Sequence, residues 1–149
     1  MIGSFLIAIL GLQPLLGFGQ QLKNVPIAFE ALSSEPEIIL LNNDIRVPRE
    51  EGHLQGVQVI EKNGEEKLLI SGSSRTQAYV LQADLVTRKT DKLICLMKEP
   101  YRHAGGIQVS EQYIVVGIED NFTKTSSKVN LYNYRDSSLY QARPNFTIE

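Results

Sequence analysis

A seven-residue pattern occurs twice in this chain, 50 residues apart, and it constrains the fold more than any other feature. His53-Leu54-Gln55-Gly56-Val57-Gln58-Val59 returns as His103-Ala104-Gly105-Gly106-Ile107-Gln108-Val109, so the shared form is His-x-x-Gly-[Val/Ile]-Gln-Val. The two copies use both histidines of the chain. A fixed period of this size is typical of repeat architectures. We therefore expect one structural unit twice, at residues 53–100 and 101–149.

Each repeat is expected to contain four short antiparallel strands with no helix between them. The first repeat predicts strands at 57–60, 68–72, 78–83 and 92–97, with Asn63-Gly64 as a hairpin turn because both turn positions favour positive φ. The second repeat predicts strands at 106–110, 113–118, 129–134 and 146–148.

The apolar patterns of these strands differ. Residues 68–70 and 113–116 are apolar at consecutive positions, which predicts burial on both faces of the strand. Residues 129–134 alternate between apolar and polar, which predicts a strand nearer the solvent-exposed edge of its sheet. Sheets that pack radially, each between two neighbours, bury both faces of a strand, as in a β-propeller.

A resemblance supports this architecture. The stretch His103-Ala104-Gly105-Gly106-Ile107-Gln108, then Tyr113-Ile114-Val115-Val116 and Lys128-Val129-Asn130-Leu131-Tyr132, resembles a blade of secreted bacterial β-propeller repeat proteins. The resemblance covers roughly residues 54–134 at the level of the superfamily, so it implies architecture and no active site.

The expected fold class is therefore all-β, with propeller-type blades. Propellers close with about 4 to 8 blades, so two repeats predict an incomplete propeller, a fragment that continues into further blades. Oligomerisation is a second way to bury the blade faces, and a small β-barrel or sandwich is a third.

The first 22 residues differ sharply from the rest, because all 15 basic and 17 acidic residues lie from Lys23 onward. An apolar run at 2–12, then small residues at Gly17 and Gly19, is the layout of a secretory signal peptide. We expect residues 1–19 to be a signal peptide, cleaved after Gly19, and the protein to be secreted or periplasmic. The alternative is a buried N-terminal helix, since no Lys or Arg precedes the run. Gln13-Pro14 interrupts it, which disfavours a stable membrane span.

Residues 20–52 are expected to form an N-terminal strand and a connector. The strand is predicted at 37–41, a short apolar run bounded by Pro36 and by Asn42-Asn43-Asp44. Residues 47–53 are mostly polar and are expected to connect this strand to the first repeat.

Four residues are the candidate ligand-binding set. If the repeats are blades, His53 and His103 occupy equivalent positions at the mouth of the central channel, where they could bind a metal or an anionic ligand. The alternative is that each histidine holds its own loop by hydrogen bonds. Gln58 and Gln108 could face the channel with their amides, or they could hydrogen-bond between blades.

Three further features have a functional and a structural interpretation. Five tyrosines, at positions 79, 113, 132, 134 and 140, could stack on sugars, although strand tyrosines more often pack with one wet end. The loop residues Glu119-Asp120-Asn121 could bind Ca²⁺, or could be a solvated loop. Cys95 is the only cysteine, so no internal disulfide forms, and its apolar neighbours predict a small buried hydrophobe.

Composition and missing motifs narrow the function. A net charge of −2 gives no basic field for nucleic acid. The chain has no Gly-x-Ser-x-Gly, P-loop, His-Glu-x-x-His or Cys-x-x-Cys. The sequence therefore identifies no particular catalytic residue, although its spacing does not exclude a Ser-His-Asp triad, and we predict no metal site and no cofactor.

We expect an exported β-propeller-like binding or protein-interaction module with a protein or carbohydrate partner. One alternative is the N-terminal fragment of a larger secreted propeller enzyme, a hydrolase or lyase with its site at the channel mouth. Another is a truncated gene product without a function of its own.

The signal peptide makes a direct prediction. N-terminal sequencing of the protein exported from its source cells should begin at Gln20, because the Gly17-x-Gly19 pair offers small residues at the two positions that signal peptidase reads. An exported protein that still begins at Met1 would contradict cleavage.

Overall fold

The computed structural model describes residues 24–48 and 50–149, and it shows an all-β protein with one short helix. The described residues form two separate units, one up to residue 37 and one from residue 38 onward. In the first unit, helix α1 (Val25–Glu30) begins after Asn24, whose side chain accepts a hydrogen bond from the Ile27 N–H. The predicted signal peptide, residues 1–19, lies outside the described residues. Within the described part, no helix is long and apolar enough to cross a membrane.

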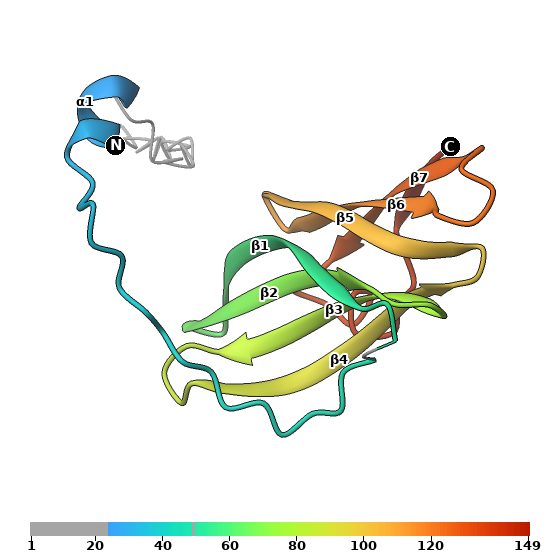
Figure 1. The fold of residues 1–149 in the computed structure, drawn as a ribbon, viewed down its shortest axis with the longest axis horizontal. Helices are drawn as coiled ribbons and strands as arrows, with labels where there is room; N and C mark the ends of the chain where they lie inside the picture. The colour runs from blue at the N-terminus through green and yellow to red at the C-terminus, as the bar shows by residue number, and fades with distance from the viewer. Residues whose placement is uncertain (1–23, 49) are drawn as a thin grey trace, which may run out of the picture. The chain divides into compact units, whose positions relative to one another are not determined.

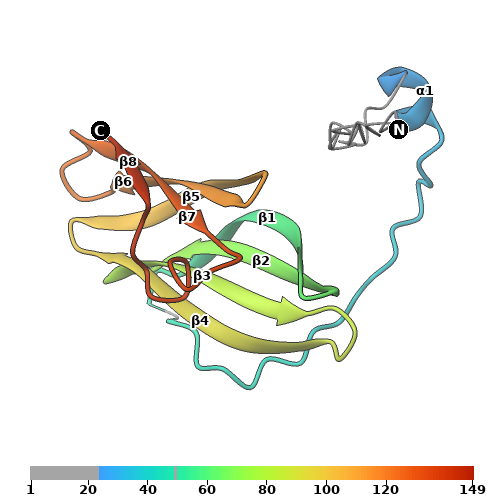
Figure 2. The same ribbon diagram turned by 180° about the vertical axis from the view of Figure 1, so that it is seen from behind.

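The second unit contains two four-stranded antiparallel sheets, each with its strands in chain order (Figures 1 and 2). Sheet 1 consists of β1 (His53–Lys62), β2 (Glu65–Ser73), β3 (Gln77–Asp84) and β4 (Lys89–Lys98). Sheet 2 consists of β5 (Tyr101–Ser110), β6 (Tyr113–Asp120), β7 (Ser127–Asn133) and β8 (Phe146–Ile148). Neither sheet closes into a barrel in the described chain.

The eight strands predicted from the two repeats are all present, most of them a few residues longer than expected. The β1–β2 hairpin turns at Asn63 and Gly64, whose φ angles of 56° and 78° are the positive values expected of that pair. The β5–β6 hairpin turns at Glu111, which also has a positive φ of 54°. Both repeats carry the same irregularity in the first strand, between Leu54 and Val57 and between Ala104 and Ile107.

The strand predicted at 37–41 is wrong. These residues join no sheet, and Ile38 and Leu40 are 78% and 77% exposed. Only Asn42 pairs, through a single parallel bridge to Lys89 at the edge of β4. The apolar run at 37–41 pairs with no strand, because the chain reaches the free edge of sheet 1 only at Asn42, after the run has ended.

The chain after this bridge covers part of the outer face of sheet 1, the face turned away from sheet 2. This covering segment (residues 42–48) begins at β4, where the Asn42 N–H donates to the Arg88 carbonyl (2.8 Å). Val47 and Pro48 then share a shallow hollow with Leu54 and with Tyr79 of β3.

Burial follows from which faces are covered. β3 is buried at six consecutive positions and β2 from Leu69 to Ser73, so these two strands of sheet 1 are buried on both faces. This agrees with the prediction for residues 68–70, although Leu68 is only half-buried. The same prediction for residues 113–116 is wrong, since burial alternates along β6 and Tyr113 and Val115 are only half-buried. β6 has the apolar sequence of a doubly covered strand, but only its inner face has a neighbour.

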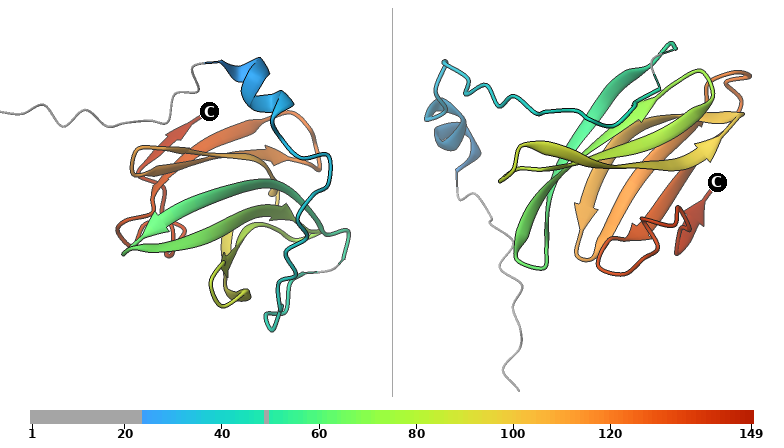
Figure 3. Two further views of the ribbon diagram at one scale, coloured as in Figure 1. Left: turned by 90° about the vertical axis from the view of Figure 1, so that its left-hand side faces the viewer. Right: turned by 90° about the horizontal axis from the view of Figure 1, so that it is seen from below.

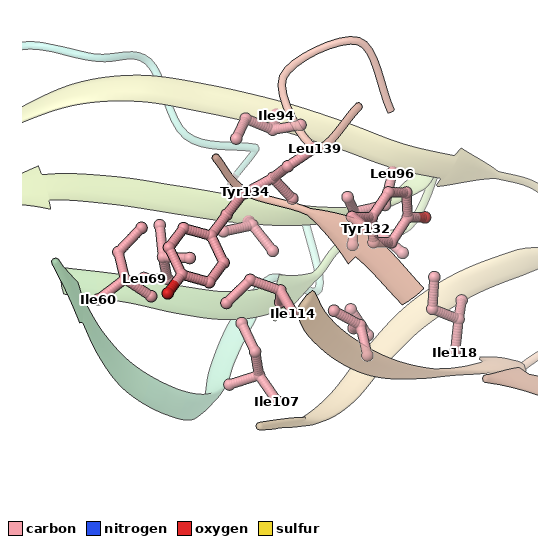
Figure 4. Close-up of a cluster of buried hydrophobic side chains, with 14 residues drawn as sticks. Ile60, Leu69, Ile94, Leu96, Ile107, Ile114, Ile118, Tyr132, Tyr134 and Leu139 are labelled. Atoms are coloured by element: carbon pink, nitrogen blue, oxygen red, sulfur yellow. The ribbon is translucent and has the colours of Figure 1, made fainter. Parts of the chain in front are cut away.

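The two sheets stack face to face through a common core, with β5 lying against β1, β2 and β3 (Figure 3). Figure 4 shows side chains from both sheets meeting between the layers. The fully buried members include Leu69, Val80, Ile114, Val116, Ile118, Tyr132 and Leu139.

The two sheets approach each other closely at Gly56. A Cβ placed on Gly56 would lie 2.7 Å from the Ile107 side chain and 2.8 Å from the Ser71 hydroxyl, so only glycine leaves room for β5. Ser71 accepts a hydrogen bond from the Gly56 N–H (2.9 Å) and donates to the Gly105 carbonyl (2.5 Å). Ser71 therefore ties both first strands together at this point.

Replacing Gly56 with alanine should lower the free energy of unfolding by about 1–3 kcal/mol, because Ile107 and Ser71 must move. The matched change in the second repeat, Gly106→Ala, should alter it by less than about 0.5 kcal/mol, since nothing lies within 4 Å of that Cβ position. Urea unfolding of dilute protein measures both values. Equal effects of the two substitutions would contradict this packing.

Candidate functional site

The two histidines predicted to be equivalent are brought together by the stacking of the sheets. His53 begins β1 and pairs with Ser73 of β2, while His103 lies near the start of β5 and pairs with Glu119 of β6. Their Nε2 atoms are 3.4 Å apart, and their ring centroids are 5.4 Å apart. Two residues 50 positions apart in the sequence thus share one site.

Three other side chains complete what we call the histidine cluster (His53, Gln55, Ser73, His103, Glu119). The Gln55 amide nitrogen is 2.6 Å from His53 Nε2 and 2.5 Å from His103 Nε2. The Ser73 hydroxyl is 3.3 Å from His53 Nε2. The Glu119 carboxylate is 3.5 Å from His103 Nδ1.

The surroundings of the Nδ1 atoms indicate the tautomers. His53 Nδ1 faces the Glu51 carbonyl at 3.4 Å. The buried His103 Nδ1 makes no hydrogen bond with the described residues, and the Glu119 carboxylate lies 3.5 Å from it. A carbonyl and a carboxylate oxygen can only accept a hydrogen bond, which favours the tautomer of each imidazole with the proton on Nδ1. Both Nε2 atoms then present lone pairs, toward which the Gln55 amide can direct its two protons.

This arrangement is not a nucleophile–base–acid relay. Ser73 lies beside His53, but its residue is only 2% exposed, so its hydroxyl is shielded from a substrate. The carboxylate of Glu119 faces the other histidine. The parts of a triad are therefore divided between two imidazoles, and none of them presents an open nucleophile.

The histidine cluster contains few of the side chains that usually bind a metal ion. Among the described residues, no group of three or more His, Cys, Asp or Glu side chains could hold an ion. The cluster offers two imidazole nitrogens, with an amide and a hydroxyl beside them.

The two predicted glutamines lie outside the histidine cluster. Gln58 bridges the sheets, since its Oε1 accepts from the Val109 N–H (3.3 Å) and its Nε2 donates to the Val59 carbonyl (3.1 Å). Gln108 repeats the second bond, to the Val109 carbonyl (3.2 Å), and its side chain is exposed. Gln58 thus hydrogen-bonds between the two blade-like sheets, which was one of the two roles considered for Gln58 and Gln108 from the sequence.

Three of the candidate sugar-stacking tyrosines are packing residues. Tyr79, Tyr132 and Tyr134 are at most 5% exposed, and burial raises the pKa of Tyr79 and of Tyr132. Tyr113 is half-buried and contacts Phe146 edge-on. Tyr140 is half-buried, with the ammonium group of Lys62 3.9 Å from its ring centre.

The acidic loop is organised by one carboxylate. Asp120 accepts from the backbone N–H groups of Phe122 (2.9 Å) and Thr123 (2.8 Å). A further hydrogen bond from the Thr123 hydroxyl is the main reason that the pKa of Asp120 lies below its usual range. These bonds occupy the carboxylate as a loop cap, in place of the Ca²⁺ ligand considered from sequence.

Cys95 is partly buried in β4, and burial raises the pKa of its thiol. A thiol with a raised pKa is a poor nucleophile at neutral pH. Cys95 therefore acts as a small packing residue, in agreement with its apolar neighbours in the sequence.

No protein-family model, curated protein or solved structure matches this chain. The histidine cluster and the stacked sheets are therefore the basis on which a function can be assigned.

The tautomers of the histidine cluster can be measured. Long-range ¹H–¹⁵N correlation spectra at neutral pH should show both histidines protonated on Nδ1, because both Nε2 atoms face the Gln55 amide. Gln55→Ala should move both imidazoles toward a mixture of tautomers. A spectrum in which either histidine of the native chain is protonated on Nε2 would contradict the described hydrogen bonds.

Proposed function

We propose that the chain is an exported β-propeller-like binding module that contacts a polar ligand through its histidine cluster. The observation that carries this proposal is the convergence of His53 and His103, from equivalent positions of two repeats, with their Nε2 atoms 3.4 Å apart. Export is supported by the uncharged, apolar start of the sequence.

Two features support the propeller comparison. The repeats form sheets of equal size and strand order, and the first strand of one sheet lies against its neighbour. Propeller blades are also four-stranded antiparallel sheets that leave short edges and stack around a channel. The resemblance to secreted bacterial propeller repeats rests on the same strands.

The chemistry of the cluster suits a small polar ligand. Its two lone pairs converge on the Gln55 amide nitrogen, which a ligand would have to displace. Neighbours on the far side of each ring orient the imidazoles, as a carbonyl or carboxylate orients a metal-binding histidine. In a tetrahedral ion with bonds of about 2.0–2.1 Å, two nitrogen ligands lie about 3.4 Å apart, which is the separation found here. Protonated imidazoles would instead donate to an anion such as phosphate.

The enzyme alternative has weaker support. Glu119 is the one carboxylate that faces a histidine of the cluster, and no accessible nucleophile accompanies it in the described chain. Binding requires only the oriented imidazoles, whereas hydrolysis or elimination requires an acid or base aimed at a substrate.

Calorimetric titration with zinc chloride, and separately with sodium phosphate, tests the proposal. His53→Ala and His103→Ala should each weaken binding of the probe at least tenfold, equivalent to about 1.4 kcal/mol. Gln141→Ala is the matched control, because this exposed glutamine lies outside the cluster and outside both sheets and should leave the affinity unchanged. If neither probe binds, or if binding survives loss of both histidines, the cluster is not a ligand site.

A further inference from the structure

The outer face of sheet 2 is an apolar surface with no neighbour among the described residues. Cross-strand pairing places Val115 opposite Leu131 and Leu131 opposite Phe146, and likewise Val129 opposite Ile148. Residues paired in this way project from the same side of a sheet. Phe146 and Ile148 are 58% and 61% exposed. We call this surface the tail face, formed by Val115, Val129, Leu131, Phe146 and Ile148 around Gly106 and Gly117.

The tail face repeats, position for position, the face of sheet 1 that sheet 2 covers. Gln58 pairs with Leu69 as Gln108 pairs with Val115, so Leu69 and Val115 are equivalent. Val80 pairs with Ile94 as Val129 pairs with Ile148, which extends the equivalence to the outer strands.

The two equivalent surfaces differ in what covers them. Leu69, Val80 and Ile94 are 0%, 0% and 5% exposed, because sheet 2 packs over them. Of their counterparts in sheet 2, Val115 and Val129 are half-buried and Ile148 is 61% exposed, and no second sheet of the described chain packs over them. Equivalent surfaces are therefore present on both sheets, but only the one on sheet 1 is covered by another sheet.

The opposite end of the stack presents the matching surface. Leu54, Val57 and Val59 of β1 occupy the repeat positions of Ala104, Ile107 and Val109, the β5 residues that pack on sheet 1. Ala104 and Ile107 are 0% and 8% exposed. The β1 side chains, which we call the head face, are 52%, 61% and 44% exposed in the same order.

The covering segment leaves Val57 and Val59 of the head face exposed, and it meets this face only at Leu54, which shares a hollow with Val47 and Pro48. It is anchored at the start of β4 and reaches β3, near Tyr79 and Leu81. The strand that makes the inter-sheet contacts in the known interface is β5, and its equivalent is β1. The β1 part of the surface needed for a second stacking contact is therefore free, whereas Tyr79 and Leu81 of β3 are already covered.

Two features of the tail face favour such a contact. In the known interface, the Ile107 side chain packs against Gly56. The equivalent glycine on the tail face is Gly106, and no atom of the described chain lies within 4 Å of its Cβ position. This leaves space there for Val57, the equivalent of Ile107. Gln58 holds Val109 across the sheets, and Gln108 keeps the same bond to its neighbouring carbonyl with its Oε1 free to accept.

We propose that a second copy of this chain docks its head face on the tail face, so that Val57 seats on Gly106 and Gln108 accepts from the Val59 N–H. Both surfaces are on every copy, so the contact is head-to-tail and continues until a ring closes. Since radial stacks of this kind close with about 4 to 8 sheets, about two to four copies complete the ring. The assembly is independent of the ligand proposed for the histidine cluster.

Light scattering and native mass spectrometry of the whole chain test this assembly. The native protein should have a mass that is a small whole-number multiple of 16.7 kDa, less any cleaved signal peptide. Gly106→Leu should give a monomer with an unchanged far-UV circular dichroism spectrum, because the added side chain fills open space within one copy but blocks Val57 of the next. Val57→Glu should do the same from the head face. Val86→Glu is the control, since Val86 is 81% exposed in the β3–β4 turn, outside both faces.

Mixing the two monomeric variants gives the sharpest result. The Val57→Glu copy keeps its tail face and the Gly106→Leu copy keeps its head face, so an equimolar mixture should form a one-to-one dimer that neither variant forms alone. A monomeric native chain at about 100 μM, or variants that remain oligomeric, would overturn the proposal. So would recovery from source cells of these peptides in one much longer polypeptide, because further repeats of that chain would then occupy the tail face.

Discussion

The contact of Ile107 with Gly56 fixes how the two sheets meet, and the other features of the second unit depend on it. A side chain at Gly56 would hold β5 away from β1, since the available space is already filled by Ile107 and the Ser71 hydroxyl. Close packing at this point allows Ser71 to bond to Gly105 and Gln58 to reach Val109. The same approach brings the rings of His53 and His103 together.

The sequence predicted the local structure well, because strands and turns depend on near neighbours. The eight strands of the repeats were expected, and the Asn63-Gly64 turn has the predicted positive φ angles. The run at 37–41 shows the limit of this reasoning. Its residues have strand-like composition, but a strand needs a partner edge, and the sequence does not say that β4 is reached only at Asn42.

Only part of the histidine cluster could be predicted. The repeat marked His53 and His103, because both occupy a shared position of the pattern. Gln55 occupies a position at which the repeats differ, so the pattern hides it. Ser73 and Glu119 reach the site through cross-strand pairing, whose register depends on the irregularity before Val57 and before Ile107. Nothing in the local sequence sets that register.

Every ladder pairing in the two sheets joins strands that are consecutive in the chain, with hairpins or short loops between most of them. Contacts within each sheet are therefore local, unlike those of Greek-key sandwiches, and the contact order of a single sheet is low. Contacts between residues about 50 positions apart, such as His53 with His103 and Gln58 with Val109, belong to the β5 interface, which cannot form until both sheets supply their faces. Stacking is thus the step whose entropy cost sets the folding rate, and substitutions at this interface should slow folding more than substitutions in the hairpins.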